Sequence, residues 1–272
     1  MEIGYMTNAF GDQVGTLEGV MSIKDSKFVT LANDKEVIEK IANVGYKYIE
    51  MFAGNLDRFK ENPDDLKEIL DKNEVSLLGV YVTANFIYED AFPDELWHIK
   101  ETAKLAKELG AKHIVLGGGA IRHDGIRDED FNTLAKNLDK AQIEIENVGL
   151  TASYHPHLGC MIENNQQIVK LFSLTDINFC PDLAHLEAGG SDAFDLVKKY
   201  KDRIKYVHLK DYKDGEFVPL GKGTIPIKDI IDYLLDNNFS GDWLVEIDGY
   251  KGDSLEACQI SYEFLSNLDI GE

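Results

Sequence analysis

Eight short segments of the chain are apolar almost throughout, instead of alternating apolar and polar residues. Such segments are typical of strands that are buried on both faces, as in a parallel sheet covered by helices. They include "VSLLGVY" and "KHIVLGGG", and they lie at 2–5, 46–52, 75–81, 112–119, 150–155, 177–182, 204–211 and 243–248. The pattern therefore predicts eight strands.

Between these strands, apolar residues recur at helical spacing. Most of these segments open with Asp, Ser or Pro, and several close on Gly or Asn, which are common first and last residues of helices. We expect helices at 34–45, 63–73, 94–110, 128–149, 163–174, 192–202, 227–238 and 254–268. Each predicted strand is thus followed by a predicted helix.

Eight alternating strands and helices in 272 residues predict an α/β protein with a single (β/α)8 TIM barrel. No linker or low-complexity tract interrupts the series, so we expect one domain over residues 1–272. Active sites of this fold lie at the carboxyl ends of the strands. The segment 11–33 is long for a loop on that face, and we expect it to act as a lid over the substrate.

The charge balance narrows the classes of partner. The chain has 49 acidic and 28 basic residues, for a formal net charge of −21, which repels phosphate backbones and anionic membrane surfaces. We expect no nucleic-acid partner and no membrane partner, and, without a signal peptide or a long apolar span, a cytoplasmic location. The three cysteines have no CxxC spacing, so they predict neither a disulfide framework nor a structural zinc site.

Ionisable and aromatic residues gather at the ends of the last four predicted strands. They are Tyr154, His155 and His157 on the fifth strand, Asp182 and His185 on the sixth, His208, Lys210 and Asp211 on the seventh, and Glu246 and Asp248 on the eighth. Because parallel strands of a barrel end at the same rim, we expect these side chains to meet.

Taken singly, several of these residues have ordinary explanations. His208 fits a core histidine bonded to a backbone carbonyl, and Asp182 fits a helix cap. Glu246 is harder to explain, because a charge inside the apolar run "WLVEI" is costly without a partner. One divalent cation would satisfy all of them together, with His155, Asp182, His208 and Glu246 as its ligands.

The ligand types limit the choice of metal. Two imidazoles and two carboxylates without a thiolate suit Mn²⁺, Co²⁺, Fe²⁺ or Zn²⁺ better than Ca²⁺ or Mg²⁺, which prefer oxygen ligands. Such an ion acts as a Lewis acid on a carbonyl or hydroxyl oxygen. Nearby side chains would then move protons, namely those of His157, His185, Lys210 and Asp248.

Four motifs, "CPDLAHLEAGG", "RIKYVHLKD", "PLGKGTI" and "GDWLVEID", resemble strand ends of the xylose isomerase-like sugar isomerase/epimerase superfamily, and the resemblance covers essentially the whole chain. It implies a (β/α)8 barrel that binds one divalent ion, commonly Mn²⁺, and that isomerises, epimerises or dehydrates sugars and inososes. It also implies that Asp182, His208 and Glu246 are metal ligands, and that His185 and Lys210 contact substrate.

The fifth strand departs from part of that superfamily. Ketose 3-epimerases carry there a Glu that binds the metal and exchanges a proton, whereas this chain has His155. The run "YHPHLG" resembles the inosose dehydratase branch instead. Losing one of two facing carboxylates argues against proton exchange from both faces of a carbon, and it leaves elimination or one-base isomerisation open.

The first half of the chain offers fewer candidates. We expect Glu50 at the end of the second strand and Tyr81 at the end of the third to reach substrate hydroxyls, together with Asp248. For Glu50 and Tyr81, an ordinary position at a strand end without a substrate contact is nearly as plausible.

These observations predict a metal-dependent enzyme that removes a proton beside the carbonyl of a polyhydroxy substrate, with catalytic roles for Glu246, His157, His185 and Lys210. Elimination, as in inosose dehydratases, is the first expectation, and sugar isomerisation or epimerisation is the alternative. A repair nuclease would need several metals and a basic surface, which the charge opposes. A non-catalytic sugar- or partner-binding barrel is a further alternative, and the oligomeric state, homodimer or homotetramer included, stays open.

Overall fold

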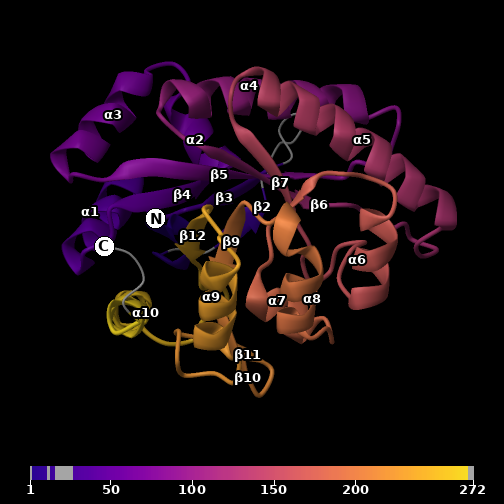
Figure 1. The fold of residues 1–272 in the computed structure, drawn as a ribbon. Helices are drawn as coiled ribbons and strands as arrows, with labels where there is room; N and C mark the ends of the chain where they lie inside the picture. The colour runs from indigo at the N-terminus through magenta and orange to yellow at the C-terminus, as the bar shows by residue number, and fades with distance from the viewer. Residues whose placement is uncertain (1, 11–12, 16–26, 269–272) are drawn as a thin grey trace.

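A computed structural model describes residues 2–10, 13–15 and 27–268 (Figure 1). Eight strands form one parallel sheet, so the predicted strands are confirmed. They are β1 (Ile3–Met6), β4 (Tyr48–Phe52), β5 (Ser76–Ala84), β6 (His113–Gly118), β7 (Thr151–His155), β8 (Asn178–Phe179), β9 (Tyr206–Leu209) and β12 (Asp242–Val245).

The sheet curves into a barrel in the order β8-β7-β6-β5-β4-β1-β12-β9. The remaining seam between β8 and β9 is bridged at two points, from Phe179 to Ile204 and from Asp182 to His208. The His208 amide also donates to the Pro181 carbonyl across this seam at 2.9 Å. The eight strands are therefore nearly closed into a ring, which confirms the predicted (β/α)8 barrel.

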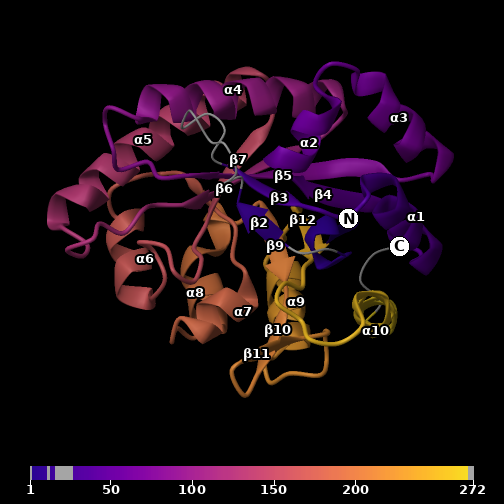
Figure 2. The same ribbon diagram turned by 180° about the vertical axis from the view of Figure 1, so that it is seen from behind.

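Helices cover the outside of the barrel, with α4 and α5 on one side and α7 to α9 on the other (Figures 1 and 2). The helices that follow successive strands are α1 (Asp34–Val44), α3 (Pro63–Lys72), α4 (Phe92–Glu108), α5 (Asp128–Asn147), α6 (Asn165–Phe172), α8 (Ala193–Tyr200), α9 (Ile227–Asp236) and α10 (Ser254–Ser266). Each begins within two residues of its predicted start.

Several of these starts are fixed by side-chain caps at or next to the predicted first residue. The side chains of Asn33, Asp192 and Asp253 each accept a hydrogen bond from the backbone amide three residues later. Such caps satisfy amide groups that have no partner within the helix. Local sequence therefore determines where α1, α8 and α10 begin.

The structure also contains elements that the sequence pattern did not predict. They are the short helices α2 (Ala53–Leu56) and α7 (Leu183–Ala188), and two antiparallel hairpins, β2 (Gln13–Gly15) with β3 (Phe28–Thr30) and β10 (Asp211–Lys213) with β11 (Glu216–Val218). The first hairpin belongs to the expected lid at 11–33. Residues 11, 12 and 16–26 of that segment lie outside the described residues, so the lid stays a prediction.

Alternating side chains of the strands build two apolar clusters. Leu77 packs in the large cluster between sheet and helices, whereas its neighbour Leu78 packs in a smaller one with Tyr81, Cys180 and Tyr206. Successive strand residues point to opposite faces, so the smaller cluster fills the barrel interior. No helix among the described residues is long and apolar enough to cross a membrane.

Candidate metal centre at the carboxyl ends of the strands

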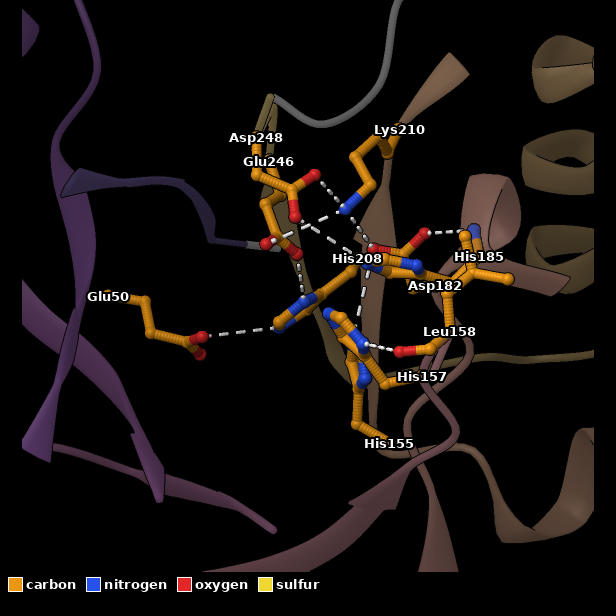
Figure 3. Close-up of polar contacts among 10 residues, drawn as sticks. All are labelled: Glu50, His155, His157, Leu158, Asp182, His185, His208, Lys210, Glu246 and Asp248. Atoms are coloured by element: carbon orange, nitrogen blue, oxygen red, sulfur yellow. Dashed lines mark hydrogen bonds and ion pairs between the residues drawn. The ribbon is translucent and has the colours of Figure 1, made fainter. Parts of the chain in front are cut away.

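Four side chains from consecutive strands meet at the carboxyl end of the barrel. Each of His155, Asp182, His208 and Glu246 offers one potential ligand atom, and these atoms all lie within 4.8 Å of one another. All four residues are buried (Figure 3). We call this set the first donor group. The structure thus brings together the four residues that the sequence nominated as metal ligands.

The backbone explains why these residues converge. His155 is the last residue of β7, His208 lies in β9, and Glu246 follows β12 directly. Asp182 is the N-cap of α7, and its Oδ1 accepts the His185 amide at 2.8 Å. The capping role considered for Asp182 is therefore real, but it uses one carboxylate oxygen and leaves Oδ2 facing the group.

Several atoms of the first donor group lack a hydrogen-bond partner. Among the described residues this holds for both ring nitrogens of His155 and for Nε2 of His208, whereas Oδ2 of Asp182 has an ion-pair contact with Lys210. Leaving buried polar atoms unpaired is costly, and such atoms are rare in folded proteins. A mixed nitrogen and oxygen set with free lone pairs fits a divalent transition cation.

His208 stands between two carboxylates. Its Nδ1 lies 2.8 Å from Oε2 of Glu246, and its Nε2 lies 3.4 Å from Oε1 of Glu50. Burial disfavours the charged ring, but Cys180 and the two carboxylates outweigh burial and raise the pKa of His208 well above its ordinary value. The metal-free ring therefore binds a proton readily.

Lys210 links the first donor group to the neighbouring residues. Its Nζ lies 3.0 Å from Oδ2 of Asp182, 3.6 Å from Oε1 of Glu246 and 2.8 Å from Oδ1 of Asp248. Burial alone would raise the pKa of both ligand carboxyl groups. The Lys210 ammonium and the neighbouring histidines together outweigh that effect, so the pKa of Asp182 lies well below its usual range and that of Glu246 falls to about 2.

A second set of donors lies beside the first. His157, His185 and Asp248 offer ligand atoms that also lie within 4.8 Å of one another. Burial, followed by the charge of a neighbouring His155 or Lys210, lowers the pKa of His157 and lowers that of His185 further. Both imidazoles are therefore neutral at physiological pH.

The expected substrate contacts in the first half lie deeper than the sequence suggested. Glu50 is completely buried inside β4 and points at His208 from across the barrel (Figure 3). Tyr81 lies inside β5, which continues to Ala84. The Tyr81 ring meets His155 edge-on at 5.5 Å. Neither residue ends its strand: β4 runs to Phe52, where the apolar run also ends, and β5 runs three residues beyond the predicted end at Tyr81.

The sequence pattern did not predict the wall of the site that the hairpin of β10 and β11 forms. Phe217 of β11 meets the His185 ring edge-on at 5.0 Å, and the Lys210 ammonium lies 4.5 Å from the centre of its ring. The hairpin that carries Phe217 has strands of only three residues, which give no recognisable period.

Fold and donor groups together define a (β/α)8 barrel with clustered potential metal ligands at the carboxyl ends of its strands, where active sites of this fold lie. The chain belongs to the xylose isomerase-like TIM barrel family, whose model matches residues 38–268. The resemblance inferred from the motifs is thereby confirmed.

Individual relatives agree with this family. An inosose dehydratase of Clostridium perfringens is 28% identical over 246 residues, which cover 78% of this chain and 81% of the relative. The probable 3-DHS dehydratase AsbF of Bacillus anthracis has a solved structure with a TM-score of 0.77 at 12% identity, covering 98% of this chain and 99% of that one. The IolI protein, solved with a zinc atom, has a TM-score of 0.74 at 20% identity, with 98% of both chains covered. At these identities, the two structures show a shared fold.

Proposed function

We propose that this protein is a divalent-metal-dependent enzyme that abstracts a proton next to the carbonyl of a sugar or inosose and then eliminates water. The observation that carries the proposal is the first donor group, four buried ligand atoms within 4.8 Å of one another at the catalytic rim. The named dehydratases among the relatives support the choice of reaction.

The first donor group suits Mn²⁺, with Co²⁺, Fe²⁺ or Zn²⁺ as alternatives, and the zinc reported for the IolI protein supports a site of this kind. His155, Asp182, His208 and Glu246 would hold the ion. When bound, it supplies Lewis-acid polarisation of a substrate carbonyl. Removing a proton from the adjacent carbon would then be easier, because the negative charge that develops on the carbonyl oxygen would be stabilised.

Glu246 is the proposed base. It is ionised, although its pKa of about 2 makes it a weak base while Lys210 lies 3.6 Å away. Burial opposes this lowering of the pKa, so a substrate hydroxyl that drew Lys210 away would let the pKa rise and make Glu246 a better proton acceptor. The ammonium would keep its salt bridge to Asp248 when it moves away from Glu246.

The second proton carrier is proposed to be His157, His185 or Lys210, with Asp248 as a substrate contact beside them. In an elimination, the C–H electron pair forms the new double bond, the β C–O bond breaks, and the departing hydroxide takes a proton to leave as water. If no hydroxide leaves and the proton removed from the carbon is added to the neighbouring carbon, the product is an isomer. Placement of one acid near the β-hydroxyl therefore separates the two reactions.

Incubation of the protein with inososes and common ketoses in D₂O with Mn²⁺, followed by NMR, tests the proposal. We expect an inosose to lose water, with deuterium entering at the carbon beside the carbonyl. A ketose that changes configuration at C3 without losing water would replace the elimination by epimerisation. That second candidate is favoured by the fold shared with a D-tagatose 3-epimerase-like protein, which has a TM-score of 0.76 at 17% identity.

Several further properties are part of the proposal. A single domain over 1–272, a lid at 11–33, a small polyhydroxy carbonyl substrate and a cytoplasmic location fit an enzyme of this kind. A non-catalytic sugar- or partner-binding barrel has no need of a stoichiometric metal, so absence of both metal and turnover in the purified protein would favour that class instead.

A further inference from the structure

The second set of donors, His157, His185 and Asp248, has the geometry of an ion site. The three residues come from three different connections: His157 follows β7, His185 lies in α7, and Asp248 follows β12. The two imidazoles lie 3.7 Å apart between ring centres, and Nε2 of His185 lies 3.8 Å from Oδ2 of Asp248. All three potential ligand atoms fall within 4.8 Å of one another.

His185 carries the strongest sign of a missing ligand. Its side chain is 2% exposed, and neither ring nitrogen has a hydrogen-bond partner among the described residues. A neutral imidazole has one N–H donor and one acceptor nitrogen, so burial of both without partners is unfavourable. An ion at this position would use the acceptor nitrogen.

His157 is already oriented as a ligand. Its Nδ1 lies 2.7 Å from the Leu158 carbonyl oxygen, which can only accept, so Nδ1 carries the hydrogen. The lone pair of the neutral ring is then on Nε2. A backbone carbonyl bonded to the second nitrogen is a common way to fix the tautomer of a metal-binding histidine.

Local charge permits more than one ion. Asp248 gives Oδ1 to Lys210 at 2.8 Å and keeps Oδ2 towards His185. With neutral imidazoles, the four carboxylates of Glu50, Asp182, Glu246 and Asp248 against one ammonium leave a net charge of −3. One divalent ion would leave −1, so a second ion meets no excess of positive charge.

We propose that His157, His185 and Asp248 bind a second divalent cation, of the Zn²⁺ or Fe²⁺ class. Three protein ligands with room for an exogenous oxygen are typical of catalytic ion sites, and two histidines with one carboxylate suit these metals. The inference goes beyond the proposed function, which requires one ion. It also makes His157 and His185 ligands, so that Lys210 remains as the mobile proton donor of the site.

Metal stoichiometry of the full chain tests the second site. The protein is stripped with a chelator, loaded with Zn²⁺, desalted and assayed for bound zinc by mass spectrometry, with calorimetric titration in parallel. We expect two zinc ions per chain in the wild type and one in His157→Gln, His185→Gln and Asp248→Asn. The control is His123→Gln, because His123 is 94% exposed and should keep both ions.

The outcomes separate this proposal from the function proposed above. One ion in the wild type that is lost in His155→Gln and kept in His185→Gln would overturn the second site and leave the first intact. No bound ion at all would overturn both. If His185→Gln fails to fold by circular dichroism, the two partly exposed positions decide: full zinc content in both His157→Gln and Asp248→Asn would overturn the proposal.

Discussion

At the scale of single residues, His208 shows how neighbours create the chemistry. Each of its ring nitrogens faces a carboxylate, Glu246 on one side and Glu50 on the other. A neutral imidazole carries one hydrogen, so one of these contacts would set a lone pair against a negative charge. Either a proton or a metal ion must resolve that repulsion, and in the metal-free ring Cys180 and the two carboxylates raise the pKa of His208, which favours the proton.

Metal binding to the first donor group should therefore release a proton. Because the pKa of His208 is raised, the ring is protonated at neutral pH without metal, and the ion must displace that proton to bind. The apparent affinity should fall about tenfold for each pH unit below the raised pKa. Titration calorimetry in buffers of different ionisation enthalpy measures the proton count directly.

The control for this measurement is His123→Gln, which changes an exposed ring. It should leave the proton count unchanged. Metal affinity that stays constant between pH 6 and pH 8 would show that His208 is not the group that competes with the ion.

Glu50 lies deeper in the barrel than the sequence suggested, and this changes the role that we predict for it. It is fully buried and faces His208, so we predict that it orients this ligand instead of contacting substrate. Glu50→Gln removes the charge at constant size, and loss of such an outer partner commonly costs 10- to 100-fold in metal affinity. Equilibrium titration with Mn²⁺ measures the loss. Glu74→Gln, at a side chain 83% exposed, is the control, and equal affinities in both variants would contradict the assignment.

At the scale of elements, Asp211 holds the connection that leads from β9 to α9. Its two carboxylate oxygens accept backbone amides of Tyr212, Gly221, Gly223 and Ile225 at 2.9 to 3.2 Å. A Cβ at Gly223 would lie 2.0 Å from Oδ1 of Asp211, so only glycine fits there. The motifs "HLKD" and "PLGKGTI" thus form one folded unit although they are separate in sequence.

Replacing Asp211 by Ala should destabilise the protein by roughly 3 kcal/mol, because four amides lose a charged and buried acceptor. Urea unfolding at fixed metal concentration measures the change. Asp236→Ala, at an exposed position in the last turn of α9, should stay within about 0.5 kcal/mol of the wild type. Equal midpoints for the two variants would show that the carboxylate is not needed to hold this connection.

The barrel could be predicted from sequence because its strands and helices are local patterns. Apolar runs and helical periods identify each element, and the caps at Asn33, Asp192 and Asp253 fix helix starts. The hairpin of β10 and β11 was missed because its strands have only three residues each and are held by Asp211 through amides up to 14 residues away. Helix α7 was missed because six residues are too few to establish a helical period.

The sequence could predict only those site residues that lie at the converging ends of the strands. His155, Asp182, His208 and Glu246 follow the rule that consecutive parallel strands deliver their last residues to one rim. Glu50 did not follow it, because Met51 and Phe52 continue β4 beyond it and its side chain lies deeper in the barrel. The pairing of β4 with β5 is also irregular, since β5 carries one extra residue, Leu78. Such irregularities re-aim side chains next to active sites and leave no mark in the apolar pattern.

At the scale of the whole molecule, an ion that bridges β7, β9, β12 and the start of α7 should stabilise the barrel across its weakest seam. Metal at 100 times its dissociation constant adds about 2.7 kcal/mol to the free energy of unfolding, which corresponds to roughly 5–10 °C in melting temperature for a protein somewhat below this size. Calorimetric melting with and without Mn²⁺ measures it. Single Ala substitutions of the four ligands should abolish the shift together with bound metal, and a His155→Ala protein with full metal content would remove His155 from the ligand set.

Which groups remove and donate protons decides the reaction of the whole site, and Glu246 is the proposed base. With a single carboxylate placed to act as both ligand and base, proton removal should occur from one face of the substrate carbon. Positioned proton transfer contributes about 10²- to 10⁴-fold to rate, so Glu246→Gln should lose turnover on that scale. Because Glu246 is also a ligand, bound metal is measured in the same sample to separate loss of the base from loss of the ion.

Lys210 provides the complementary measurement for elimination. Its ammonium contacts Asp182 and Asp248, and burial, which lowers its pKa, is outweighed by these carboxylates, so the group stays protonated and able to serve the leaving hydroxyl. With an inosose in D₂O, Lys210→Met should block loss of water while deuterium still enters at the carbon beside the carbonyl. NMR follows both signals in one sample. Loss of exchange and elimination together, at full metal content, would place Lys210 in proton abstraction, and unchanged elimination would remove it from the reaction.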